Sequence, residues 1–117
     1  MQAYSFTSRP IADALMRAKG RNVAVIVIAD KSQKHERFTQ IKGVKQYGIP
    51  VYIDYKPAIS HNKILIVDQQ TIIGGSYNFS EAAEKRNCEN VTFIKNKNIA
   101  NQYLANFNSR LKESTAY

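Results

Sequence analysis

The chain has 117 residues, of which 44% are hydrophobic and 22% charged, a composition that fits one small folded domain and excludes a disordered segment. Its 17 Lys and Arg residues outnumber the 9 Asp and Glu residues, and the formal charge of +8 suits a polyanionic partner, either nucleic acid or an anionic membrane surface. A merely basic, soluble surface explains the charge equally well. The single cysteine, Cys88, excludes an intrachain disulfide and a cysteine-rich metal site.

The first half of the chain predicts strands that alternate with helices. Runs of β-branched residues favour strands, and apolar residues at helical spacing between them favour helices. In chain order we expect a strand at 2–6, a helix from Ser8 and Pro10 to Gly20, a strand at 23–29, a helix at 31–47 and a strand at 49–54. The inner face of the second helix is expected to carry Phe38, Ile41, Val44 and Lys45. This alternation is typical of a parallel sheet.

After Pro57 the pattern changes to a predicted hairpin. Strands are expected at 60–67 and 71–74, joined by a turn at Asp68-Gln69-Gln70, then a helix at 80–85, a strand at 90–94 and an amphipathic helix at 98–112. Neither a linker nor an internal repeat divides the sequence. We therefore expect one α/β domain over residues 1–117, with a mixed, mainly parallel β-sheet flanked by helices on both faces. No leader pattern is visible, and no membrane span is expected.

The most informative segment is the predicted hairpin with the residues at its two ends. Side chains alternate faces along a strand, so His61 and Lys63 present an imidazole and an ammonium group on one surface. The glycines at 74–75 permit a tight path that returns Ser76 and Asn78 towards them. Together these four groups suit a phosphate, with Lys63, Ser76 and Asn78 binding its oxygens and His61 free to attack phosphorus or move a proton. Taken singly, each residue is more simply explained as ordinary surface or turn chemistry.

Asp68 belongs to the same segment but has the opposite parity to His61 and Lys63. It also lies where the chain must turn. We therefore expect a structural role for Asp68 at the hairpin and not a catalytic one.

The spacing H-x-K, four residues, D, six residues, G-S-x-N resembles the HKD motif of the phospholipase D superfamily. The motif positions are His61, Lys63, Asp68, Gly75, Ser76 and Asn78. Further segments, among them Tyr4-Ser-Phe-Thr7 and Phe79-Ser-Glu-Ala-Ala83, are similar to the small Nuc-type bacterial endonucleases, and the resemblance covers nearly the whole chain. Compared with those proteins the chain is expected to lack the first strand and helix, which bares a flank of the sheet.

The resemblance implies a mechanism without metal or cofactor. One motif histidine attacks the phosphodiester and forms a covalent phosphohistidine, a second protonates the leaving oxygen, and water then hydrolyses the intermediate. Because this chain carries one motif, the resemblance implies a homodimer with the two His61 side chains facing each other. Glu89, in the run Asn-Cys-Glu-Asn, is implied to support the nucleophilic histidine; Glu81 and Glu84 are the alternatives.

Three functions stay open. The first is an endonuclease of low specificity that hydrolyses DNA or RNA, with basic residues walling its site: Lys31, Lys34, Lys56 and Lys85. The second is a lipid phosphodiesterase or phosphatidyltransferase, and the third is a nucleic-acid-binding module without turnover. The resemblance suggests a bacterial periplasmic or secreted protein, and a cytoplasmic location stays open.

Overall fold

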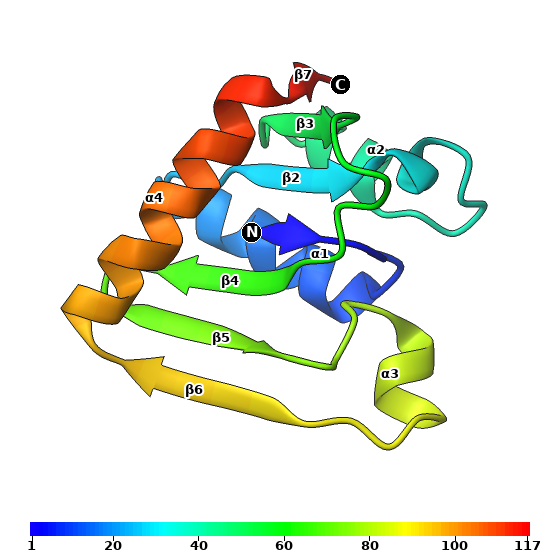
Figure 1. Ribbon diagram of the computed structural model, residues 1–117. Coiled ribbons are helices and arrows are strands. Elements are labelled where there is room, and N and C mark those ends of the chain that lie inside the picture. The colour runs from blue at the N-terminus through cyan, green and yellow to red at the C-terminus, as the bar shows by residue number, and fades with distance from the viewer.

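In the computed structural model, which describes residues 1–117, a seven-stranded mixed sheet forms the middle layer (Figure 1). Its strands are β1 (Gln2–Ala3), β2 (Val27–Asp30), β3 (Val51–Asp54), β4 (Lys63–Val67), β5 (Thr71–Gly75), β6 (Val91–Lys95) and β7 (Thr115–Ala116), in the spatial order β6-β5-β4-β1-β2-β3-β7. β1 and β3 each pair with β2 in parallel, whereas all other pairings are antiparallel. The expected mixed α/β class is confirmed, but the sheet is mostly antiparallel and not mainly parallel. The reason is that the β4–β5–β6 meander and β7 contribute only antiparallel neighbours.

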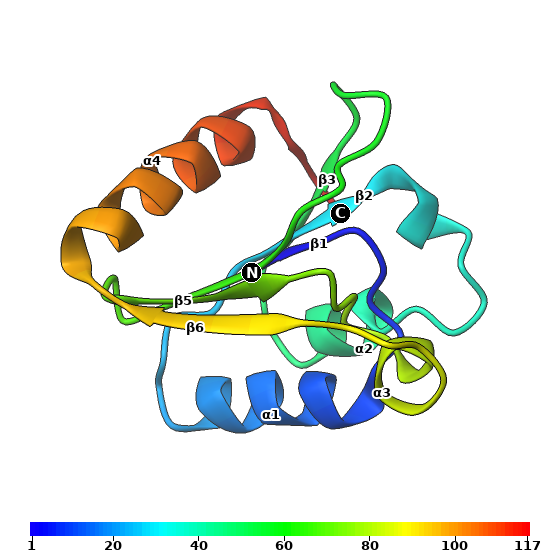
Figure 2. The ribbon, with the colours of Figure 1, turned by 60° about the horizontal axis from the view of Figure 1, so that its bottom comes forward.

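Helices cover both faces of the sheet, as expected (Figure 2). On one face lie α1 (Arg9–Gly20), α2 (Ile41–Gln46) and α3 (Glu81–Lys85), and on the other lies α4 (Lys97–Glu113). Ser8 caps α1 by accepting a hydrogen bond from Ile11 N, and Asn96 caps α4 in the same way through Ile99 N. These caps explain why both helices begin close to their predicted positions.

The single helix expected at 31–47 is wrong. A 3₁₀ turn, η1 (Lys31–Lys34), and α2 are separated by an irregular segment because polar groups at its two ends bond to a distant part of the chain. The buried Gln33 accepts from Phe6 N at 2.9 Å, and Gln40 N donates to Phe6 O at 2.8 Å. As a result Phe38 is 64% exposed and Lys45 is exposed too, whereas Ile41 and Val44 are buried as predicted.

Several strands also differ from their predicted bounds. The strand predicted at 60–67 begins only at Lys63, so His61 lies in the segment just before β4. β1 ends at Ala3, with only an isolated bridge from Phe6 to Phe79 beyond it, and β2 begins at Val27. β7 was not predicted, and it adds a short edge next to β3. Two-residue strands carry no usable sequence pattern, so their positions depend on the neighbours with which they pair.

The hydrophobic core lies between the sheet centre and helices α1 and α2, and includes Phe6, Val27, Ile41 and Ile53. On the other face, Arg110 of α4 donates to both carboxylate oxygens of the buried Asp54, at 2.9 and 2.8 Å. This bidentate pair fastens α4 to β3.

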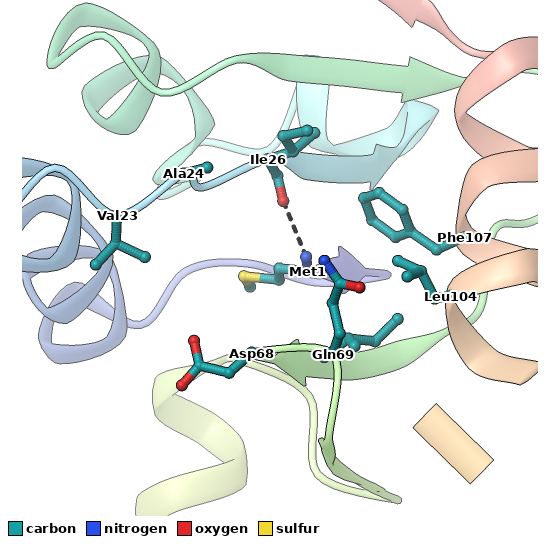
Figure 3. Close-up of a pocket in the computed structure, with 9 residues that line it drawn as sticks. Met1, Val23, Ala24, Ile26, Asp68, Gln69, Leu104 and Phe107 are labelled. Atoms are coloured by element: carbon teal, nitrogen blue, oxygen red, sulfur yellow. Dashed lines mark hydrogen bonds between the residues drawn. The ribbon is translucent and has the colours of Figure 1, made fainter. Parts of the chain in front are cut away.

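A second feature of the α4 face is an apolar cavity of about 300 Å³ beside the central strands (Figure 3). Its walls include Ile26, Leu104, Phe107 and Met1, whose amino group donates to Ile26 O at 2.9 Å. Burial lowers the pKa of this amino group to about 5. The side chains of the sheet and of α4 therefore leave part of the space between them unfilled.

Candidate active site

His61 and Lys63 lie side by side where β4 begins, as their shared strand parity predicts. Lys63 Nζ is 3.1 Å from His61 Nε2 and also donates to His61 O at 3.1 Å. A lysine ammonium group has only donors, so Nε2 must accept in this contact and the ring proton belongs on Nδ1. The nitrogen that faces Lys63 therefore carries the lone pair that a nucleophile needs.

Tyr4 completes this surface, although the sequence analysis assigned it no role in the site. Its ring meets that of His61 edge to face, with centroids 4.5 Å apart, and Lys63 Nζ lies 5.6 Å from the Tyr4 ring centre. The position follows from the pairing of β1 with β4, which continues in the hydrogen bond from Tyr4 N to Asn62 O. The sequence did contain an indication of this role, because Tyr4 is the first residue of one of the segments similar to the Nuc-type endonucleases.

Ser76 is held by two hydrogen bonds, one through its backbone and one through its hydroxyl, to the segment that precedes β6. Ser76 N donates to Asn90 O at 3.1 Å, and Asn90 N donates to Ser76 Oγ at 3.0 Å. Gly75 makes this approach feasible: its φ is +153°, and a Cβ atom there would collide with Asn90 O. The motif glycine is thus required by the backbone path that brings Ser76 to the site.

Glu89 lies in the same corner, but within one chain it has no hydrogen bond with His61. Its carboxylate accepts from Ser76 Oγ at 3.5 Å, and it is close enough to act on Lys63. Burial lowers the pKa of Lys63, and the negative charge of Glu89 partly opposes that shift. Support of the nucleophilic histidine by Glu89 stays a prediction.

The two alternative glutamates are engaged elsewhere. Glu81 pairs with Lys85 at 2.8 Å, and Glu84 accepts from the Tyr77 hydroxyl at 2.6 Å. That hydrogen bond, together with burial and the charge of Glu84, raises the pKa of Tyr77 to about 12. Neither glutamate has a hydrogen bond with His61.

Asn78 adds a side-chain amide whose Oδ1 is buried and accepts no hydrogen bond from the protein. Its backbone is fixed, since Asn78 O accepts from Ser80 N at 2.7 Å. A polar cavity of about 610 Å³ has Asn78 in its wall. The amide is therefore positioned at the border between the motif and that cavity.

Asp30 positions the residue before His61, a role that the sequence did not reveal. The carboxylate lies at the end of β2, is only 1% exposed, and accepts from Ser60 N at 2.7 Å and from Ser32 N at 2.9 Å. Burial alone would raise the pKa of Asp30, but these hydrogen bonds outweigh it and the pKa is lowered. An ionised Asp30 thus anchors the loop from which His61 projects.

Asp68, the third residue of the motif name, lies at the opposite end of β4 from His61. It borders the apolar cavity of the α4 face (Figure 3), and both Asp68 and Gln69 adopt left-handed backbone conformations, with φ of 53° and 56°. Gln70 N donates to Val67 O and closes the turn. At about 3.3 Å per strand residue, Asp68 is roughly 20 Å from His61, in agreement with a structural role.

Three of the four lysines expected around the site, Lys31, Lys34 and Lys85, have side-chain contacts of their own. Lys31 Nζ donates to Pro57 O at 3.2 Å, and Lys34 Nζ lies 5.5 Å from the Tyr55 ring centre.

Nowhere do three or more His, Cys, Asp or Glu side chains gather in a way that could hold a metal ion. No helix has both the length and the apolar character needed to cross a membrane.

Comparison with known proteins agrees with this geometry. A family model described as cardiolipin synthase, PLD-like domain, matches residues 1–111. The chain is 40% identical over 116 residues to the phospholipase D of Rickettsia prowazekii, with 99% of this chain and 57% of that protein covered. It is 29% identical over 104 residues to the mitochondrial cardiolipin hydrolase of Chlamydomonas reinhardtii, with 89% and 47% covered. The chain thus spans about half the length of these relatives.

A solved structure is also closely similar. The phospholipase D family member Nuc from Salmonella typhimurium superposes with a TM-score of 0.94 at 36% identity. The superposition covers 100% of this chain and 79% of Nuc. The likeness therefore extends to the whole chain and includes the hairpin that carries His61 and Lys63.

Proposed function

Because the chain belongs to the phospholipase D-like family, we propose that it is a metal-independent phosphodiesterase that hydrolyses nucleic acid, DNA or RNA, with low sequence specificity. The observation that carries the proposal is the 3.1 Å contact between Lys63 Nζ and His61 Nε2 on an accessible surface. The formal charge of +8 favours a polyanionic substrate over a small neutral one.

In the first chemical step, the Nε2 lone pair of His61 attacks phosphorus. A phosphorus–nitrogen bond forms as the bond from phosphorus to the leaving oxygen breaks, and a second histidine gives that oxygen a proton. Lys63 neutralises a non-bridging oxygen, while the Ser76 hydroxyl and the Asn78 amide donate to the others. Charge that develops on phosphate oxygens is thereby stabilised by groups held in place before the reaction.

In the second step, water attacks the phosphohistidine. The phosphorus–nitrogen bond breaks, His61 recovers its lone pair, and the proton lost by water returns to the second histidine. The chain supplies one motif histidine, so we propose that the second is His61 of another copy of the chain in a twofold dimer. Each composite site then contains two copies of His61 in different roles.

The test is plasmid nicking in excess chelator, with His61→Asn as the inactive control. We expect cleavage by the unmodified protein to persist, because Lys63, Ser76 and Asn78 bind the phosphate. Activity that disappears with chelator and returns with magnesium would contradict the mechanism. Binding of nucleic acid without cleavage would instead favour a non-catalytic module.

A lipid phosphodiesterase is the second candidate, and one observation favours it. An apolar cavity of about 370 Å³ borders Lys63, with walls that include Leu65, Ile73 and Phe93. Phe93 is 70% exposed, so an acyl chain could enter while the head-group phosphate lies near Lys63. Phe93→Asp should then lower hydrolysis of cardiolipin vesicles and leave plasmid nicking unchanged. Nicking by a protein that hydrolyses no lipid would exclude this candidate.

A further inference from the structure

The polar cavity of about 610 Å³ is formed by three segments that are distant in the sequence. They are the connection from β1 to α1, the irregular segment between η1 and α2, and the region around α3, all at the end of the sheet where β2 and β3 finish (Figure 1). Asn78 belongs both to the motif and to the cavity wall, and Ser5 follows Tyr4, which contacts His61. The cavity is therefore next to the candidate active site.

Phe38 is one of only two hydrophobic residues in the wall of this cavity, and it is 64% exposed. Its backbone is held on both sides: Phe38 N donates to Glu36 Oε1 at 3.2 Å, and Phe38 O accepts from Gln40 Nε2 at 3.1 Å. The backbone of Gln40 is in turn hydrogen-bonded to the core residue Phe6. The segment thus presents an anchored aromatic ring to solvent beside a polar cavity.

Arginine side chains accompany this ring. The Arg37 guanidinium lies 5.2 Å from the Phe38 ring centre, and Arg86 belongs to the cavity wall. Neither arginine forms an ion pair in the structure. Of the two acidic wall residues, Glu81 is paired with Lys85, and Glu36 accepts the hydrogen bond from Phe38 N. Phe38 therefore has one arginine at its ring and a second in the same cavity wall, and both guanidinium groups are free to meet phosphate.

An exposed aromatic ring with free arginines nearby is the combination by which proteins hold single-stranded nucleic acid. One unpaired base stacks on an exposed ring, and the arginines bind the phosphates on either side of that base. In a duplex the bases are already stacked and paired, so the ring has no base face available. The same surface therefore discriminates between the two forms of substrate.

We propose that this cavity binds an unpaired stretch of the nucleic-acid substrate, with one base stacked on Phe38 and adjacent phosphates at Arg37 and Arg86. The proposal rests on the proposed function and makes it more specific: the preferred substrate is single-stranded or locally unpaired. Asn78 then contacts the scissile phosphate from the edge of the same cavity.

Binding to a fluorescent 12-nucleotide single strand and to its duplex tests the proposal, measured by anisotropy in a His61→Asn background. Phe38→Ala should weaken single-strand binding roughly 5- to 150-fold more than duplex binding, the value of about one stacked base. Phe38→Tyr should restore single-strand binding. Tyr47→Ala, which removes another exposed aromatic residue, is the matched control and should leave both affinities unchanged.

Arg86→Ala tests the phosphate contact separately. The slope of log affinity against log salt for the single strand should decrease in magnitude by about 0.7, the value for one phosphate contact. Equal losses for single strand and duplex in Phe38→Ala, or no loss, would overturn the stacking role. An unchanged salt slope in Arg86→Ala would overturn the phosphate contact.

Cleavage by the unmodified protein separates this inference from the function on which it rests. If that protein cleaves nucleic acid while Phe38→Ala binds the single strand as tightly as its parent, the inference alone fails. If the unmodified protein neither binds nor cleaves nucleic acid, the proposed function fails and the inference fails with it.

Discussion

Replacing Asp30 with asparagine should damage both stability and catalysis, because this carboxylate holds the loop before His61. Its two oxygens accept from Ser32 N and Ser60 N at 2.9 and 2.7 Å. An asparagine side chain has one acceptor oxygen and one NH₂ group, so one of the two backbone N–H groups would face another donor. The substitution is nearly isosteric, so the change is confined to hydrogen bonding and charge.

The size of the effect follows from burial. Hydrogen bonds to charged groups contribute about 1.5–3 kcal/mol each, and Asp30 is only 1% exposed. Losing one such bond therefore predicts a decrease of about 2–3 kcal/mol in the free energy of unfolding. The free energy of unfolding of a small domain is about 5–15 kcal/mol, so the variant should still fold. Release of Ser60 should also displace His61 and lower kcat.

The contribution of Asp30 to the free energy of unfolding should depend on pH in a definite direction. The folded-state pKa of Asp30 is lowered, so its ionised form stabilises the fold at every pH above the usual aspartate pKa of about 3.9. That contribution is lost as pH falls through the lower, folded-state pKa. The stability difference between the parent and Asp30→Asn should therefore be full at pH 7 and shrink in strong acid.

Urea denaturation and plasmid nicking at 25 °C measure the two effects. Arg110→Leu is the matched control, since it leaves the buried Asp54 without its partner and should cost about 3–5 kcal/mol while sparing kcat of the folded protein. An Asp30→Asn variant as stable as its parent would refute the energetic argument. A destabilised variant with unchanged kcat would show that Asp30 does not position His61.

Further predictions concern the motif itself. His61→Ala should abolish nicking while DNA affinity stays within about twofold, because many basic side chains supply the binding charge; comparable nicking would exclude His61 as the nucleophile. Lys63→Ala should lower kcat at least about 100-fold, the usual effect of removing a group that stabilises transition-state charge, and a smaller loss in single-turnover assays would contradict its role. With a threefold excess of His61→Ala, activity per unmodified chain should fall to about one quarter after subunit exchange, because only unmodified pairs hold two His61 side chains; unchanged specific activity despite proven exchange would show that each chain works alone. Gly75→Ala should destabilise the fold and separate Ser76 from Asn90, since the new Cβ meets Asn90 O; circular dichroism melting checks the first effect, and an unchanged melting curve would argue against it.

The local features of this protein could be predicted from the order of its amino acids. Two-residue periodicity predicted that His61 and Lys63 share a surface apart from Asp68, and the structure brings His61 and Lys63 together although β4 begins only at Lys63. Capping residues and apolar spacing likewise predicted α1 and α4 to within one or two residues. Such features depend on residues a few positions apart, so they can be inferred from the order of amino acids alone.

Features that depend on residues distant in the sequence could be seen only in the folded chain. The contact of Tyr4 with His61 requires β1 to lie beside β4, and the anchor from Asp30 to Ser60 joins segments 30 residues apart. The helix predicted at 31–47 is interrupted because Gln33 and Gln40 bond to Phe6. Buried polar groups must find hydrogen-bond partners wherever the fold provides them, and this requirement overrides local helix propensity.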